Sequence, residues 1–297
     1  QLGQDFFFYF WRLAYNGAEN IHYNTLQKFD EKFSQFGFKR SAFYPLYGLA
    51  ESTVFVSGCI GIEYIVVDKF ELNENKVVLT EPDNQNSKIL VSAGKPKVPL
   101  IIVSEYPHKK CNDGQIGEIW LTGDSVAEGY WNNQEASKVF NAVLDDSDKK
   151  TYLQTGDLGF IYNENLYITG RIKDLIIING KNHYPNDIEL TVELSDSSIR
   201  RGCSVAFSVN HEDKERLVVI AELKSSMDVP EYKKLVDEIR QNVSLNHNLE
   251  VYMVAFASPR SIPKTTSGKL RRRHTKKLLE NNSLKLVFTW MAEGDVK

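Results

Sequence analysis

The chain has 297 residues, of which 42% are hydrophobic and 25% are charged, a composition typical of folded proteins and not of disordered ones. Thirty-six Lys and Arg residues stand against 39 Asp and Glu residues, and the resulting net charge of −3 excludes an overall basic field that would favour nucleic acid. This length allows one large domain or two ordinary ones.

No apolar run approaches the ~18 residues that a membrane-spanning helix requires, so we expect no membrane span. The three cysteines, Cys59, Cys111 and Cys203, are far apart and predict neither a CxxC metal site nor a disulfide framework. This cysteine pattern favours a reducing, cytoplasmic compartment. Because the sequence starts with Gln1 and no signal peptide follows, we expect a fragment of a longer protein.

The N-terminal region contains six consecutive aromatic residues at positions 6–11. Each ring offers about 150–250 Å² of surface, so an exposed run of this kind would promote aggregation. The run therefore predicts a buried strand or helix of a larger domain whose partner surface is missing, or else a cloning artefact.

Short strand patterns and turn residues alternate over the first half of the chain. Residues 12–15 and 41–47 are predicted strands, and apolar residues at helical spacing from Asn24 to Phe36 predict a helix that Gly37 ends. Residues 59–90 change character and predict an inserted hairpin, because short β-branched runs alternate there with Asn, Glu and Asp clusters. Further strands are expected within 114–121 and 152–168.

The pattern changes after Gly170. A helix is predicted over 185–194, strands over 203–209 and 217–223, a helix over 231–245 and a strand over 251–257. These elements form a plausible α+β domain. We place its boundary at Lys173 and Asp174.

The first stretch whose residues could bind a ligand is Tyr47-Gly48-Leu49-Ala50-Glu51-Ser52. An aromatic ring can stack on a flat base, a glycine lets the backbone approach it, and a carboxylate can hold a cation. The alternative is an ordinary surface loop.

Asp157 and Arg171 lie in two further Gly-containing stretches, 155–159 and 169–174. A carboxylate can accept two hydrogen bonds from a ribose diol, and a guanidinium can bind phosphate or ribose oxygens in a bidentate manner. The alternative is a turn aspartate with a surface arginine as its partner.

Lys269 lies in a Gly-Lys pair within 263–273, a stretch that superficially resembles a phosphate-binding loop. A Walker A motif would require Gly where Pro263 stands and Ser or Thr where Leu270 stands, so the stretch fails that test. Residues 251–279 contain eight Lys or Arg and no acid, which leaves a nucleic-acid or membrane surface as the rival to a lysine that reaches an anionic reaction centre.

Five blocks in this order and spacing together resemble the adenylate-forming superfamily of acyl-CoA synthetases, luciferases and adenylation domains. The blocks are Asn16-Gly17-Ala18-Glu19, 47–58, 155–159, 170–185 and 263–273. Within the superfamily the chain is most similar to the fatty acyl-AMP ligases, which carry an insertion where residues 59–90 lie.

The resemblance implies an α/β fold in two parts. Residues 1–173 would be the C-terminal part of the large AMP-binding domain, with mixed sheets, a β-barrel subdomain and the 59–90 insertion. Residues 174–297 would be the small, mobile α+β lid domain.

The resemblance also implies an activity. Fatty acid and ATP, with Mg²⁺, would give acyl-AMP and pyrophosphate, and the acyl group would pass to the phosphopantetheine thiol of an acyl carrier protein. No nucleic-acid partner is expected. The implied roles are adenine binding for Asn16, Gly17, Ala18 and Glu19, base stacking for Tyr47 beside Gly48, Mg²⁺ binding for Glu51, ribose binding for Asp157, ribose and phosphate binding for Arg171, hinge motion for Asp174, and carboxylate and α-phosphate binding for the catalytic Lys269.

Two departures from the family pattern limit these expectations. Ala50 stands where many superfamily members have Thr, although the acyl-AMP ligase branch commonly has Ala there. No Ser/Thr/Gly-rich phosphate loop followed by Lys occurs in the chain, so the 297 residues alone are expected to be inactive.

Three alternatives stay open from the sequence. The first is an acyl-CoA synthetase or an amino-acid adenylation domain. The second is a truncated, non-catalytic module that binds a nucleotide or a carrier protein. The third is nucleic-acid binding through the basic segment 260–277. Acyl chain length, carrier protein, pathway and oligomeric state leave no pattern in the sequence.

Overall fold

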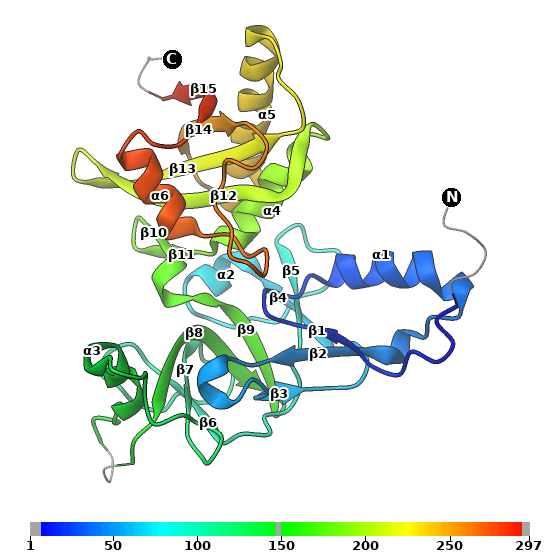
Figure 1. Ribbon diagram of the computed structural model, residues 1–297, viewed down its shortest axis with the longest axis vertical. Coiled ribbons are helices and arrows are strands. Elements are labelled where there is room, and N and C mark those ends of the chain that lie inside the picture. Colours follow the sequence, from blue (N-terminus) through cyan, green and yellow to red (C-terminus); the bar gives the residue numbers. More distant parts are fainter. Residues whose placement is uncertain (1–6, 147–149, 293–297) are drawn as a thin grey trace. The chain divides into compact units, whose positions relative to one another are not determined.

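The computed structural model describes residues 7–146 and 150–292 and divides into two compact units, Gln1–Ile172 and Lys173–Lys297 (Figure 1). The division falls one residue before the boundary at 173 and 174 that we place from the sequence. Each unit is described by itself below.

The first unit begins with a three-stranded sheet in the order β1-β2-β3, formed by Ala14–Asn16, Phe43–Tyr47 and Ser57–Gly58. Strands β1 and β2 are parallel and are connected through α1 (Tyr23–Phe33), which continues as a 3-10 turn over Ser34–Phe36. Gly37 follows with a positive φ of 86° and ends the helix, as the sequence predicts.

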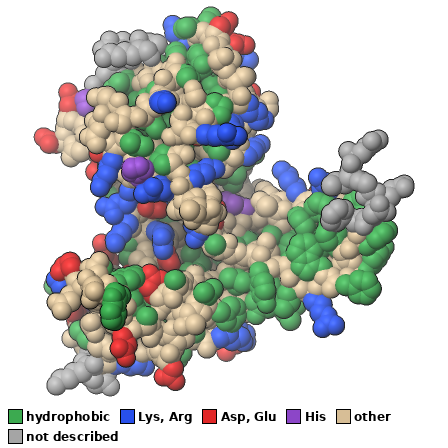
Figure 2. Space-filling view, in the orientation of Figure 1, with side chains coloured by type: hydrophobic (Ala, Val, Ile, Leu, Met, Phe, Trp, Pro, Cys, Tyr) green, Lys and Arg blue, Asp and Glu red, His purple; other side chains and the backbone are tan. Residues whose placement is uncertain are grey.

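The described aromatic residues 7–11 form neither a strand nor a helix, so that prediction is wrong. Phe8 packs edge-on against Phe33 with ring centroids 5.4 Å apart, and Trp11 packs against the ring of Phe38 at 5.7 Å. Phe10, in contrast, is 94% exposed. Figure 2 shows hydrophobic side chains gathered on this part of the first unit. Phe6 lies outside the described residues.

The segment expected as an insertion contains β4 (Tyr64–Asp68), α2 (Lys69–Asn73) and β5 (Ser87–Val91). Strands β4 and β5 pair antiparallel, which confirms the predicted hairpin. Helix α2 was not expected; it begins because the Asp68 carboxylate accepts hydrogen bonds from two backbone N–H groups of the first turn.

A four-stranded antiparallel sheet follows in the order β6-β7-β8-β9, formed by Leu100–Val103, Gly117–Leu121, Leu153–Tyr162 and Asn165–Arg171. Helix α3 (Gln134–Ser137) and a 3-10 turn (Lys138–Asn141) lie between β7 and β8.

The expected β-barrel is wrong for the strands that the structure describes. Strands β6 and β9 are the two edges of this sheet and do not pair with each other. The outer edge of β9 instead pairs with the backbone after β5, because Ala93 N–H donates to Leu166 O at 2.8 Å and Leu166 N–H donates to Gly94 O at 3.0 Å.

The second unit has its own sheet in the order β12-β13-β14-β15, formed by Ile199–His211, Lys214–Leu223, Val251–Ala257 and Leu286–Met291. Its other elements are the hairpin of β10 (Ile176–Ile178) and β11 (Lys181–His183) and the helices α4 (Pro185–Ser195), α5 (Val229–His247) and α6 (Arg272–Glu280). The predicted helices and strands of this unit are confirmed, whereas β10, β11, α6 and β15 were not predicted.

Both faces of this sheet are covered, as β14 shows. Val254 and Phe256 belong to one core with residues of α4 and α5, while Ala255 and Ala257 belong to a second core, against which Leu279 of α6 packs. All seven residues of β14 are therefore buried, which explains its continuous apolar sequence.

Candidate functional site

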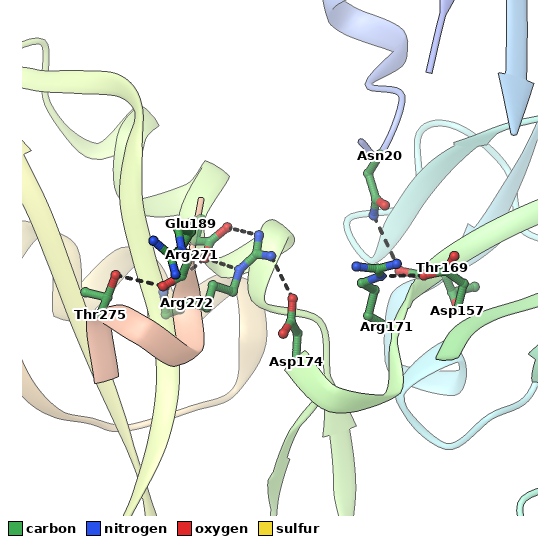
Figure 3. Close-up of polar contacts among 10 residues, drawn as sticks. Asn20, Asp157, Thr169, Arg171, Asp174, Glu189, Arg271, Arg272 and Thr275 are labelled. Carbon is green, nitrogen blue, oxygen red and sulfur yellow. Dashed lines mark hydrogen bonds and ion pairs between the residues drawn. The ribbon is translucent and has the colours of Figure 1, made fainter. Parts of the chain in front are cut away.

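A buried carboxylate forms the centre of the candidate site in the first unit. Asp157 on β8 is 7% exposed, and each of its oxygens accepts one hydrogen bond from a side chain. The Tyr47 hydroxyl donates to Oδ2 at 2.7 Å, and Arg171 Nε donates to Oδ1 at 2.6 Å. Figure 3 shows Arg171 and Asp157 side by side on neighbouring strands.

The local sequence explains this placement. Strands β8 and β9 pair antiparallel with Asp157 directly opposite Arg171, so the two side chains can meet on the same face of the sheet. Burial and the neighbouring carboxylate of Asp157 raise the pKa of Tyr47, which keeps its hydroxyl protonated as a donor. The three residues form one fixed group.

A carboxylate held in this way can bind a diol. Each carboxylate oxygen has two lone pairs, and Tyr47 and Arg171 each use one, so both oxygens of Asp157 retain an acceptor position. Two neighbouring hydroxyls, as in a ribose, match this pair of acceptors. The Arg171 side chain is 62% exposed and places a cation beside them.

The turn 16–19 lies beside this group. Asn16 ends β1 and pairs with Pro45, two residues before Tyr47 on β2. Asn20, directly after the turn, places its amide Nδ2 3.5 Å from Thr169 O on β9, as Figure 3 shows. The structure therefore brings together four of the five predicted blocks, through Asn16, Tyr47, Asp157 and Arg171. Asn20 is a further contact that the sequence did not indicate.

The residues present in this turn fit a nucleotide base. Asn16 Oδ1 is buried and accepts no hydrogen bond from any residue that the structure describes, so it can accept one from an amino group. Gly17 is closely approached, since a Cβ there would lie 2.8 Å from Leu46 Cδ1. Ala18 follows with a φ of 72°, which turns the chain sharply.

Glu51 lies on a tightly folded loop. A Cβ at Gly48 would lie 1.5 Å from Val54 O, so only glycine allows the chain to pass. Thr53 and Val54 have φ values of 52° and 75°, a conformation that a β-branched residue adopts only when its surroundings enforce it.

The segment before α3 holds this loop. Tyr130 hydroxyl donates to Glu51 Oε1 at 2.5 Å, and Ala127 N–H donates to Glu51 O at 2.8 Å. Thr53 Oγ1 also donates to Ser125 O at 2.8 Å. The bond to Glu51 is the main reason why the pKa of Tyr130 is raised to about 12. Sequence spacing gave no indication of Tyr130.

The carboxylate of Glu51 fits Mg²⁺ only as one of several ligands. Among residues 7–146 and 150–292, no group of three or more His, Cys, Asp or Glu side chains could hold a metal ion. Mg²⁺ commonly takes one or two carboxylates and completes its octahedron with waters and substrate phosphates. Glu51 is consistent with that mode of binding.

Lys269 belongs to the second unit, on a short hairpin. Lys264 and Leu270 form an antiparallel bridge, Thr265 N–H donates to Lys269 O at 2.9 Å, and Gly268 turns the chain with a φ of 88°. The lysine itself is partly exposed. The segment that superficially resembles a phosphate loop is therefore a β-turn between two bridged residues, Lys264 and Leu270.

Asp174 also belongs to the second unit and binds an arginine that the sequence analysis did not single out. Arg272 Nη1 donates to Asp174 Oδ2 at 3.0 Å, and the same guanidinium binds Glu189 through Nε and Nη2, both at 2.7 Å (Figure 3). Glu189 lies between the core residues Ile188 and Val192 on α4, and a buried acid on an apolar helix face indicates a buried cation partner.

Two known protein families match this chain, one in each unit. A family described as "AMP-binding enzyme" matches residues 8–131, and one described as "Disco-interacting protein 2-like, AMP domain" matches residues 173–288. None of the described helices is long and apolar enough to cross a membrane.

Curated relatives are fatty-acid ligases. The medium-chain-fatty-acid–[acyl-carrier-protein] ligase JamA of Moorena producens is 42% identical over 88% of this chain and 46% of its own length. The long-chain-fatty-acid–AMP ligase FadD32 of Mycolicibacterium smegmatis is 34% identical over 91% of this chain and 49% of its own. The chain thus spans about half the length of the curated relatives it matches.

Solved structures of fatty acyl-AMP ligases are also similar to this chain. A structure from a study of fatty acyl-adenylate ligases of E. coli and L. pneumophila is 30% identical, with a TM-score of 0.82 over 93% of this chain and 48% of the other. The fatty acid AMP ligase of Legionella pneumophila is 37% identical, with a TM-score of 0.58 over 98% of this chain and 52% of the other. The chain therefore resembles the fatty acyl-AMP ligases among the AMP-binding enzymes, and the similarity extends over most of this chain and about half the length of those relatives.

Proposed function

We propose that the protein containing this chain activates a fatty acid with ATP, giving acyl-AMP and pyrophosphate, and passes the acyl group to the phosphopantetheine thiol of an acyl carrier protein. The observation that carries the nucleotide part is the buried Asp157 carboxylate, which Tyr47 and Arg171 hold with one acceptor position left on each oxygen. The fatty acid and the carrier protein follow from the names of the relatives.

In this proposal the first unit binds the nucleotide. Asp157 accepts hydrogen bonds from the ribose hydroxyls, Arg171 binds the ribose and phosphate side, and Tyr47 orients the carboxylate while its ring borders the base. The turn Asn16–Glu19 lines the adenine pocket, and Asn16 Oδ1 accepts from the adenine amino group. Glu51 takes part in binding Mg²⁺, which neutralises phosphate charge when bound.

The second unit supplies the charge for the reaction. Attack of a carboxylate on the α-phosphate brings two anions together, and a fixed cation lowers the barrier where that charge accumulates. Lys269 provides the cation, and Asp174 serves as the hinge of the lid domain. A protein that shuts for adenylation and opens for a thiol can carry out both steps in turn.

The test is a purification of the natural gene product that contains residues 1–297, followed by incubation with fatty acid, ATP and Mg²⁺. We expect acyl-AMP and pyrophosphate, and acyl transfer to a phosphopantetheine-bearing carrier protein in preference to coenzyme A. Rapid acyl-CoA formation would instead support an acyl-CoA synthetase, the activity that the name of the relative fadD21 suggests.

Lys269→Ala in that protein should lower the rate of acyl-AMP formation by about 10²–10³-fold while nucleotide binding persists, because a charge aimed at the reacting phosphate is lost. Lys264→Ala is a matched control, since Lys264 lies on the opposite strand of the same hairpin. The rate is measured by fatty-acid-dependent ATP–pyrophosphate exchange. Undiminished exchange in Lys269→Ala would overturn the role of Lys269.

A second candidate is a non-catalytic nucleotide-binding module, because the Asp157 group can hold a diol whether or not a reaction follows. Such a module would bind ATP through the Asp157 group but form no acyl-AMP. Calorimetric ATP binding by the natural product, with no pyrophosphate release in the presence of several fatty acids, would support it.

A further inference from the structure

One guanidinium joins three segments of the second unit. Arg272 is the first residue of α6, and its fork binds both oxygens of Glu189 on α4, each at 2.7 Å. Glu189 is 5% exposed and also accepts from Ala206 N–H of β12 at 3.1 Å. A bidentate pair of this kind fixes the orientation of the arginine as well as its position.

The charges of this pair support each other. Burial by itself would lower the pKa of Arg272, but its interactions with Glu189 and Asp174 together outweigh burial and raise that pKa above its ordinary value. Burial raises the pKa of Glu189, and the bonds from Arg272 oppose this. Replacing either partner would leave a buried charge uncompensated, which is strongly destabilising.

The third bond of Arg272 reaches the start of the unit. Its Nη1 donates to Asp174 Oδ2 at 3.0 Å, and the Asp174 side chain is 20% exposed. Asp174 closes a 3-10 turn (Ile172–Asp174) at the division between the two units. One guanidinium therefore holds two carboxylates that lie on separate segments, Glu189 on α4 and Asp174 before β10.

Arg272 also lies at the foot of the Lys269 hairpin. Lys269 N–H donates to Thr265 Oγ1 at 3.0 Å, and Arg271 N–H donates to Pro263 O at 3.1 Å. These bonds close the hairpin immediately before α6. The position of Lys269 therefore depends on where Arg272 is anchored.

We propose that Arg272 is a positioning residue, which links the hairpin bearing Lys269 to the Asp174 segment at the division between the units. Glu189 holds the guanidinium in place, and the bond to Asp174 transmits the state of that segment to the hairpin. This inference rests on the proposed function of Lys269 only for its catalytic consequence, because the link itself is a property of the second unit.

Amide hydrogen exchange on the full chain tests the link without substrate. Asp174→Ala removes only the third bond and keeps the buried pair, so the unit should fold. Since a hydrogen bond to a charged, partly exposed group contributes about 1 kcal/mol, exchange should become about fivefold faster in 172–177. A smaller acceleration should appear in 263–271, and Asp174→Asn should restore part of the protection in both segments.

Two further variants complete the design. Lys173→Gln alters the neighbouring exposed residue and should leave both segments unchanged. Arg272→Lys keeps the charge but loses the fork, and should accelerate exchange in both segments. Unchanged exchange in 263–271 for both Asp174→Ala and Arg272→Lys would overturn the proposal.

Kinetics of the natural gene product separates this inference from the proposed function. Asp174→Ala should lower the kcat of ATP–pyrophosphate exchange about fivefold with the KM for ATP unchanged, because the lysine and not the nucleotide site is displaced. If the unmodified protein forms no acyl-AMP but the exchange data show the link, the proposed function fails and the link stands. If adenylation occurs and both Asp174→Ala and Arg272→Lys keep full kcat, the link does not influence the position of Lys269 during catalysis, and that part of the inference is wrong.

Discussion

A carboxylate buried in a protein interior is stable only when donors replace the water that it loses. Asp157 has such donors on both oxygens, from Tyr47 and from Arg171. Tyr47 is 8% exposed and belongs to the core of the first unit, so its hydroxyl is fixed before any ligand arrives. Because Asp157 is already oriented, little further ordering is required when a diol binds.

Tyr47→Phe should destabilise the first unit by about 1.5–3 kcal/mol, since the buried carboxylate loses a hydrogen bond to a charged group. Affinity for ATP or AMP should fall as well, because Asp157 is no longer held on both sides. Tyr44→Phe, three positions earlier on β2, is the matched control. Urea unfolding and calorimetric titration measure the two effects, and equal behaviour of both variants would contradict the assignment.

His183 makes stability depend on pH. It is 5% exposed on β11, and burial, assisted by Lys181, lowers its pKa to about 4 from an ordinary value of 6.5. The unfolded chain therefore binds a proton at higher pH than the folded chain does. The stability contributed by the neutral imidazole is fully present above about pH 6.5 and is lost as the pH falls towards 4.

The expected loss is at most about 3 kcal/mol, since one pKa unit corresponds to about 1.4 kcal/mol. His183→Leu should remove this part of the pH dependence. The measurement is urea unfolding of the unmodified protein and His183→Leu at several pH values between 7 and 4. The two free energies of unfolding are subtracted at each pH, so that the contributions of other titrating groups cancel. A constant difference across that range would show that His183 does not titrate in this way.

At the scale of elements, the loop after β2 shows how a strained segment is kept in one conformation. Val54 has a positive φ, and hydrogen bonds between the loop and residues 125–130 hold it in place around Glu51. Loops positioned by a rigid scaffold commonly carry ligand contacts. The strain at Val54 is consistent with such a role.

Gly48→Ala should destabilise the first unit by about 3 kcal/mol, because its Cβ would overlap Val54 O and force the loop to move. Gly61→Ala is the control: Gly61 has a φ of 83°, unlike Gly48, and a Cβ there meets nothing within 4 Å, so only the conformational cost of about 1 kcal/mol remains. Thermal unfolding measures both. A smaller effect at Gly48 than at Gly61 would contradict the steric account.

At the scale of the whole molecule, the chain consists of two units with separate cores. The largest core cluster contains only residues of the second unit, from Ile176 to Phe288. A further cluster on the other face of the same sheet also stays within that unit. The second unit therefore has the buried apolar surface that an independent domain needs.

We expect residues 173–297 to fold when produced alone. The isolated unit should show cooperative unfolding, and amides of β13 and β14 should be protected from exchange as they are in the full chain. Trp290, the one tryptophan in this part of the sequence, provides a fluorescence signal for the transition. A chain without protected amides would show that the first unit is required for folding.

Local patterns in the sequence determined many of the elements. The helical spacing from Leu26 to Phe33 gives α1, and the apolar face of α5 from Tyr232 to Val243 is buried as its spacing predicts. Helix α6 was missed because its surface is rich in Lys and Arg, so a charge pattern obscured the helical one. The open edge of the β6–β9 sheet was missed because strand pairing between distant segments leaves no local signal.

The sequence by itself also predicts which blocks can bind a ligand, since each block is contiguous and its residue types suit one ligand. Only the tertiary structure decided which side chains complete them. Tyr47 and Asp157 are 110 residues apart, Glu51 and Tyr130 are 79 apart, and Glu189 and Arg272 are 83 apart. Periodicity and turn chemistry act over a few residues, whereas these contacts form only when separate elements pack and bury polar groups that must then find partners.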